Sequence, residues 1–199
     1  MKSLKMITSL LLESLVIVAL LASPGASRGE ALSPLVDDFS DTQNNSLGIP
    51  RQFVNDTVSG GSTSTMQSVS EGVLSVTGEI VPPRGQPGWA SSVLQLDPQG
   101  LPRDASTFEG IRLLVRVNKG TISISANSTD VTNFDYHAAA IVAESDGEFH
   151  EVRIPFTSMK RAWSEQTPLN TTTLSSLSIV AFGVQKGAYD FDVDEVAFY

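Results

Sequence analysis

The residue types that carry nucleophilic or metal-assisted catalysis are scarce in this chain. It has no cysteine, and its 2 histidines are His137 and His150. The pair His150-Glu151 begins like the zinc motif H-E-x-x-H, but Ile154 stands where the second histidine is needed. Residues 60–64 approach the G-x-S-x-G nucleophile turn, but they end in serine rather than glycine. These departures predict that the chain is not an enzyme of either kind.

Paired carboxylates are the remaining candidates for chemistry. Asp192 and Asp194 lie in an extended segment at a spacing of two, which projects both side chains to one face. Two carboxyl groups can serve as acid and base or nucleophile in glycoside hydrolysis. A small glycan-active enzyme using Asp and Glu therefore stays open as an alternative, beside the simpler interpretation of a solvated acidic face.

Aromatic rings are the candidates for ligand binding, because the apolar face of a sugar packs against an exposed ring. Trp89 follows a glycine in a segment with the pattern of a core strand, so we expect it to be buried. Tyr136 lies in an extended run, and Trp163 follows a lysine and an arginine in a polar segment. We therefore predict Tyr136 and Trp163 as ligand-binding residues, with a packed loop anchor as the alternative role for Trp163.

Extended segments must position these side chains, because a period of two dominates the apolar pattern. Residues 110–117 alternate, Lys119-Gly120 forms a turn, and residues 121–126 resume the alternation, which predicts a hairpin. Residues 152–156 alternate as well. Pro155 cannot donate a ladder hydrogen bond, so it indicates an edge strand or a strand end.

The C-terminal part of the chain continues the strand pattern. Residues 178–184 form a nearly continuous apolar run, which is typical of a strand buried on both faces. In residues 189–199 the alternation changes phase, which predicts a β-bulge near Glu195. Residues 171–177 favour one helical turn at most. Short strands separated by turn residues indicate a single all-β sandwich or barrel.

The N-terminal segment has the order of a secretory signal peptide. Lys2 and Lys5 precede an apolar stretch that ends at Ala22, and small residues follow up to Ser27. The sequence predicts a signal peptide over 1–27, one domain over 28–199, and a secreted or periplasmic location. Cleavage after Ala22 and retention as an uncleaved anchor are the alternatives.

Charge and composition limit the classes of partner. The chain carries 13 Lys and Arg against 22 Asp and Glu, a formal net charge of −9. An acidic surface repels phosphate backbones, so we expect no nucleic-acid partner. No later apolar run reaches the length of a membrane-spanning helix, and without cysteine the fold needs no disulfide.

Seven segments in a fixed order form a recognisable set of motifs. They are 36–39 (VDDF), 54–62 (VNDTVSGGS), 88–91 (GWAS), 104–113 (DASTFEGIRL), 152–156 (VRIPF), 179–183 (IVAFG) and 191–199 (FDVDEVAFY). Together they resemble the CIA30 family, named for the mitochondrial complex I intermediate-associated protein, and the likeness covers nearly all of residues 28–199. This chain departs from the family pattern at Ser59, where the family usually has methionine, and near Gly88-Trp89, where the family usually reads Gly-Gly-Phe.

The resemblance implies a jelly-roll β-sandwich of galactose-binding-like type, akin to some carbohydrate-binding modules. In such modules a structural Ca²⁺ often lies near the chain ends, which makes Asp38, Asp192 and Glu195 the candidate ligands. Surface carboxylates without a metal are the alternative, and no other cofactor is expected. We expect a non-catalytic module that binds a glycan or a protein partner. A protein-interaction or assembly factor, as in the mitochondrial relatives, is the second hypothesis.

Overall fold

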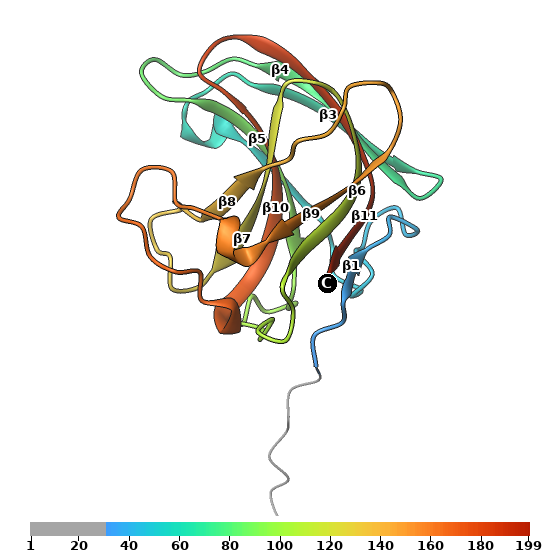
Figure 1. Cartoon of the computed structure of the whole chain (residues 1–199). Coiled ribbons are helices and arrows are strands. Elements are labelled where there is room, and N and C mark those ends of the chain that lie inside the picture. Colours follow the sequence, from blue (N-terminus) through green and yellow to red (C-terminus); the bar gives the residue numbers. More distant parts are fainter. Residues whose placement is uncertain (1–30) are drawn as a thin grey trace, which may run out of the picture. The chain divides into compact units, whose positions relative to one another are not determined.

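The computed structural model describes residues 31–199, and the predicted signal peptide lies outside the described residues. Strands dominate this part of the chain, with three short 3₁₀ turns between them (Figure 1). No helix of the described residues is long and apolar enough to cross a membrane. The prediction of an all-β fold is therefore confirmed.

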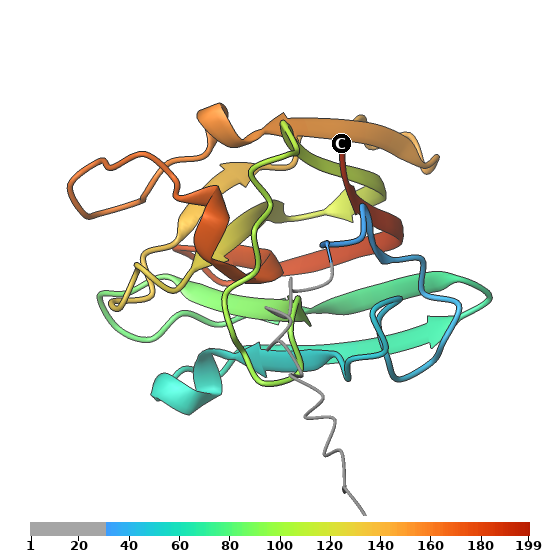
Figure 2. The ribbon, with the colours of Figure 1, turned by 90° about the horizontal axis from the view of Figure 1, so that it is seen from below.

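The strands form two antiparallel sheets. The larger sheet has the order β3-β4-β11-β6-β9, with β1 paired to β11, and the smaller sheet has the order β2-β5-β10-β7-β8. Figure 2 shows the larger sheet extending from β9 (orange) at one edge to β3 (teal) at the other. The strands of the smaller sheet follow in the same direction, from β8 to β2. The larger sheet contains β1 (Leu35–Asp37), β3 (Ser64–Ser70), β4 (Val73–Ile80), β6 (Gly110–Lys119), β9 (His150–Pro155) and β11 (Gly187–Phe198). The smaller sheet contains β2 (Gln52–Asn55), β5 (Gly88–Gln95), β7 (Thr121–Ser128), β8 (His137–Ala140) and β10 (Leu174–Gly183).

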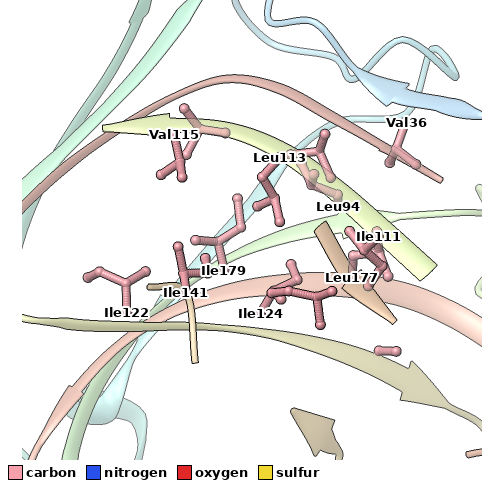
Figure 3. Close-up of a cluster of buried hydrophobic side chains, with 14 of the residues drawn as sticks. Val36, Leu94, Ile111, Leu113, Val115, Ile122, Ile124, Ile141, Leu177 and Ile179 are labelled. Carbon is pink, nitrogen blue, oxygen red and sulfur yellow. The ribbon is translucent and has the colours of Figure 1, made fainter. Parts of the chain in front are cut away.

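One apolar face of each sheet forms the core, as period-two alternation requires. Figure 3 shows side chains of the larger sheet, such as Leu113 and Val115, opposite Ile124 of β7 and Ile179 of β10. All four are fully buried. Removal of this apolar surface from water is the main force that holds the two sheets together.

The predicted hairpin over residues 110–126 is wrong. Strands β6 and β7 follow each other closely, but β6 pairs with β9 and β11, whereas β7 pairs with β8 and β10. The chain therefore crosses from one sheet to the other at Gly120. This glycine has φ +90°, and a Cβ there would lie 2.8 Å from the Tyr189 Cβ. A left-handed backbone and a close neighbour both favour glycine at the crossover.

Three local predictions are confirmed. The register between β11 and β6 shifts between Val193 and Glu195, which is the expected bulge. Strand β9 lies at a sheet edge and ends at Pro155. The expected helical turn is the 3₁₀ turn η3 (Thr171–Thr173), where the Asn170 side chain accepts the Thr172 N–H.

Candidate functional site

The outer face of the smaller sheet carries no charged side chain in the strands that the structure describes. Residues that lie opposite one another in an antiparallel ladder project to the same face. The register therefore assigns this face directly, because Leu177, Ile179 and Ala181 of β10 point into the core. We call it the uncharged face, and it consists of Gln52, Val54, Trp89, Ser91, Val93, Gln95, Thr121, Ser123, Ser125, Asn127, Ala138, Ala140, Ser176, Ser178, Val180 and Phe182.

Two aromatic residues lie at one end of the uncharged face. Phe182 is paired with Trp89 on β5 and with Thr121 on β7, so the three side chains form one row across the sheet. Phe182 is 38% exposed, and Trp89 is half-buried outside the core cluster. The expectation that Trp89 belongs to the core is therefore wrong, because alternation along β5 places Ala90 in the core and Trp89 on the opposite face.

The other end of the uncharged face is a network of small polar side chains. Asn127 Nδ2 donates to Ser176 Oγ at 2.9 Å and to Ser178 Oγ at 2.7 Å, and Ser125 Oγ donates to Asn127 Oδ1 at 2.9 Å. These four residues are buried although they point away from the core. Their mutual hydrogen bonds satisfy polar atoms that would otherwise lose water at a cost.

Exposed aromatic rings lie in the loops next to this polar end. Tyr136 directly precedes β8, and the alternation that brings Ala138 to the uncharged face brings Tyr136 to the same side. Phe134 makes an edge contact with Tyr136, at 6.3 Å between ring centroids. Phe134 is 77% exposed and Trp163 is 70% exposed. The Trp163 ring is therefore not packed against the protein, and its ligand-binding role stays a prediction.

A buried carboxylate fixes the two loops that carry these rings. The N–H groups of Ala162, Trp163 and Ser164 donate to Asp135 at 2.7, 3.1 and 2.6 Å. Asn133 Nδ2 also donates to Ser164 Oγ at 2.9 Å, which ties the loop tips together. Two effects oppose each other at the Asp135 carboxyl: burial acts to raise its pKa, whereas the hydrogen bonds from Ser164 and the neighbouring N–H groups act to lower it. The hydrogen bonds are stronger, so the pKa of Asp135 lies below its ordinary value.

A second buried carboxylate, Asp56, holds the backbone of Trp89. The Trp89 N–H donates to Asp56 Oδ2 at 3.2 Å, and Thr63 donates from its N–H and its hydroxyl at 3.0 and 2.6 Å. A Cβ at Gly61 would lie 2.2 Å from the Asp56 Cγ, and one at Gly88 would lie 2.9 Å from Oδ2. The glycines of the 54–62 and 88–91 motifs thus make room for this carboxylate. Sequence reasoning missed this role of Asp56, although those glycines were the signal for it.

The outer face of the larger sheet differs, because it carries paired charges. Arg116 binds Asp192 at 2.9 Å, and Arg112 bridges Glu195 and Glu151. The Ser75 hydroxyl also donates to Asp192 at 2.5 Å. Carboxylates neutralised by guanidinium groups are poorly placed for acid–base chemistry or for holding a cation.

The structure does not gather the three predicted calcium ligands into one site. Asp192 and Glu195 are paired with arginines, and the Asp38 carboxylate accepts hydrogen bonds from Ser40 and Ser46. These bonds, that from the Ser40 side chain first, lower the pKa of Asp38. Among residues 31–199, no three His, Cys, Asp or Glu side chains lie so that they could share a metal ion.

The calcium hypothesis has a direct test in the melting temperature. A ligand that binds only the folded state raises the melting temperature of the protein. If Ca²⁺ is bound, the melting temperature should therefore be higher in calcium than in chelator. With the candidate carboxylates already paired, we expect the two melting temperatures to agree in differential scanning fluorimetry. A calcium-dependent rise of several degrees that disappears in Asp38→Asn would contradict this expectation.

The two histidines have local partners. His137 is buried, and its Nε2 lies 2.7 Å from the Thr167 carbonyl oxygen. His150 Nε2 lies 2.8 Å from Asp146 Oδ1 on the surface. The hydrogen bond to Asp146 raises the pKa of His150. Within residues 31–199, neither histidine is bonded to a serine or threonine hydroxyl.

The described residues thus form an antiparallel β-sandwich whose smaller sheet has an uncharged outer face. The chain belongs to the CIA30 family, because its residues 39–193 match the profile of Complex I intermediate-associated protein 30 (CIA30). This match confirms the resemblance found in the sequence. Among curated proteins, none matches the sequence.

Solved structures with the same fold include carbohydrate-binding modules. A family 11 carbohydrate-binding module from Clostridium thermocellum, in complex with a β-1,3-1,4-mixed-linked tetrasaccharide, has 18% identity and a TM-score of 0.58 over 85% of this chain and 96% of that chain. The family 11 module of the cellulosomal cellulase Lic26A-Cel5E from the same organism has 17% identity and a TM-score of 0.57, over 85% and 95%. An agarase, AgWH50C, has 11% identity and a TM-score of 0.52 over 82% of this chain and 24% of that chain. These likenesses establish the fold.

Proposed function

We propose that this protein is an exported, non-catalytic carbohydrate-binding module of CIA30 type that holds a neutral glycan on the uncharged face. One observation carries the proposal: aromatic rings lie at both ends of a sheet face that has no charged side chain. The chain has a net charge of −9, so an uncharged surface of this extent is a local property and not a reflection of composition.

The residue types on this face suit a sugar chain. The apolar C–H face of a pyranose packs on rings such as Trp89 and Phe182, while accessible polar groups orient its polar edge. On this face they include Gln52, Ser91 and Thr121. A charged sugar would find no counter-ion on this face, and the net charge of −9 repels an anionic one. Neutral polysaccharides are therefore the ligand class that the face favours.

The spacing of the aromatic rings indicates the length of the ligand. Strand β5 extends from Trp89 at one end of the face to Gln95 beside the Asn127 network at the other. At about 3.4 Å per residue, these two positions are roughly 20 Å apart. A ligand that contacts both ends must be an oligosaccharide rather than a single sugar.

The experiment is affinity electrophoresis and calorimetry with soluble neutral β-glucan. We expect saturable binding that changes little between low and high salt, because no ion pair forms. Trp163→Ala and Tyr136→Ala should each weaken binding tenfold or more, as removal of a central aromatic anchor does in other interfaces. Trp89→Ala tests the opposite end of the face.

Arg153→Ala is the matched control, because Arg153 lies on the outer face of the larger sheet and is 57% exposed. It should bind glucan like the unchanged protein. Equal binding by all four variants, or stronger binding to anionic polysaccharides, would refute the proposal.

A protein-interaction or assembly factor is the second candidate function, and membership of the CIA30 family favours it. Co-purification from the native host followed by reconstitution with the purified partner distinguishes it from glycan binding. A glycan-active enzyme has less support, because Arg116 and Ser75 already occupy the Asp192 carboxylate. Polysaccharide hydrolysis that is lost in Asp192→Asn would revive that alternative.

A further inference from the structure

One edge of the sandwich leaves the space between the sheets open. Strands β3 and β2 are the edge strands on this side of their sheets. Gln67 of β3 lies opposite the core residue Val76, so it points toward the interior, yet it is exposed. The opposite edge is closed by buried apolar side chains, among them Phe156 and Met159. An inward-pointing exposed side chain indicates that no element of residues 31–199 covers the interior at β3.

A cleft of about 380 Å³ lies at this open edge. Its apolar floor includes Phe53, Val76 and Ala90, and its rim includes Thr65 and Gln67 of β3. None of its lining residues is charged. A volume of this size accommodates a large apolar side chain with room for neighbouring backbone.

Ser92 adds a hydroxyl group to the lining of this cleft, and the residue is 3% exposed. Its hydroxyl is not left unsatisfied, because His137 Nδ1 is the one buried side-chain polar atom of residues 31–199 without a hydrogen-bond partner. A hydroxyl in the cleft lining favours an occupant that brings a hydrogen-bonding group beside its apolar surface.

Strand β3 is also the least protected edge among the described strands. Proteins block free edges with charged residues, proline, short strands or covering segments. Strand β9 carries Glu151, Arg153 and Pro155, and the free edge of β8 is bonded to Lys160. Strand β2 has 4 residues, whereas β3 has 7 and contains no charged residue, proline or glycine.

We propose that this edge binds an extended peptide segment of a partner protein, which pairs with β3 as an added strand and inserts one apolar side chain into the cleft. The free N–H and C=O groups along β3 have the spacing of an extended peptide, so a peptide can pair with them. The cleft then selects the inserted side chain, as in other strand-addition interfaces. The segment should be uncharged, because the cleft offers no counter-ion and the exposed Glu71 follows β3 directly. The cleft opens between the sheets and the peptide pairs with the larger sheet, so the proposal goes beyond glycan binding, although Val54 and Ser91 of the uncharged face also line the cleft.

The test uses the full chain and a capped seven-residue peptide of alternating serine and threonine with phenylalanine at its centre. Titration followed by amide NMR should show saturable shifts concentrated in β3 and β2. N-methylation of alternate peptide nitrogens, which removes strand hydrogen bonds, should weaken binding at least tenfold. Replacement of the phenylalanine by aspartate should do the same.

Two protein variants complete the experiment. Ser92→Leu fills the cleft and should weaken peptide binding at least tenfold, while circular dichroism and the urea unfolding midpoint report an intact fold. Ser68→Leu, on the outer side of β3 opposite Ser75, is the matched control and should bind the peptide normally. Absence of binding, or binding that ignores both N-methylation and Ser92→Leu, overturns the proposal. Concentration-dependent dimerisation that the peptide does not displace also overturns it, because a second copy is then the occupant.

Discussion

Arg51→Met should lower the free energy of unfolding by about 3–5 kcal/mol, because it leaves the Asp37 carboxylate buried without its partner. Arg51 Nε lies 2.5 Å from Asp37 Oδ2, and the two side chains are 2% and 0% exposed. Arg51 Nη2 donates to Asp37 Oδ1 at 2.7 Å, and Nη1 donates to the Asp41 carbonyl oxygen at 2.8 Å. Urea denaturation followed by circular dichroism measures the loss.

A double variant separates the charge from the packing. Arg51→Met with Asp37→Leu removes both charges, so it should recover much of the stability that the single substitution loses. Arg153→Met breaks the exposed pair with Glu151 and should change the stability little. If Arg51→Met proves as harmless as Arg153→Met, the ion pair does not anchor β1 to the segment before β2.

Asp135→Ala should disorder the loop that presents Trp163 and abolish glycan binding at that end of the uncharged face. The substitution leaves three N–H groups without their acceptor, and hydrogen bonds to a charged group are the strong ones. We expect a loss of about 2 kcal/mol or more in the free energy of unfolding. Hydrogen exchange should show faster exchange at the amides of Ala162, Trp163 and Ser164.

Acid should produce a similar effect in the unchanged protein. The pKa of Asp135 is lowered from the ordinary value of 3.8, so its contribution to stability is present above that value and is lost as the pH falls through the lower folded value. The loop should therefore stay closed at pH 5 and open only in stronger acid. Asp130→Ala, which removes the exposed bond to Asn170, is the matched control and should leave Trp163 in place. Loop opening already near pH 5 would contradict this assignment.

Local alternation predicted the strands well, because each strand buries one face regardless of its partner. Pro155 marked the end of an edge strand, and the change of phase near Glu195 marked the bulge. The ordered motifs indicated the family and, through it, the two-sheet fold. Alternation gave the wrong partner for β6, because a short turn at Gly120 is compatible with a hairpin and with a crossover between sheets.

The site was predicted only in part. The aromatic content of the loops indicated Tyr136 and Trp163, and the structure leaves the Trp163 ring exposed. The outward direction of Trp89 was missed, because a glycine-tryptophan pair in a strand pattern does not reveal which face is buried. The buried carboxylates of Asp56 and Asp135 were also missed, since their hydrogen-bond donors lie at distant positions in the sequence.

The amino-acid sequence by itself determined the extended segments, the turns between them, the acidic charge and the family. Side-chain periodicity and turn chemistry are local, so they can be read without knowing strand partners. Only the tertiary structure decided which faces meet water, because the register between strands sets which side chains point toward the core and which point toward solvent. That register assembles the uncharged face, neutralises Asp192 and Glu195 with arginines from neighbouring strands, and leaves the interior open beside β3.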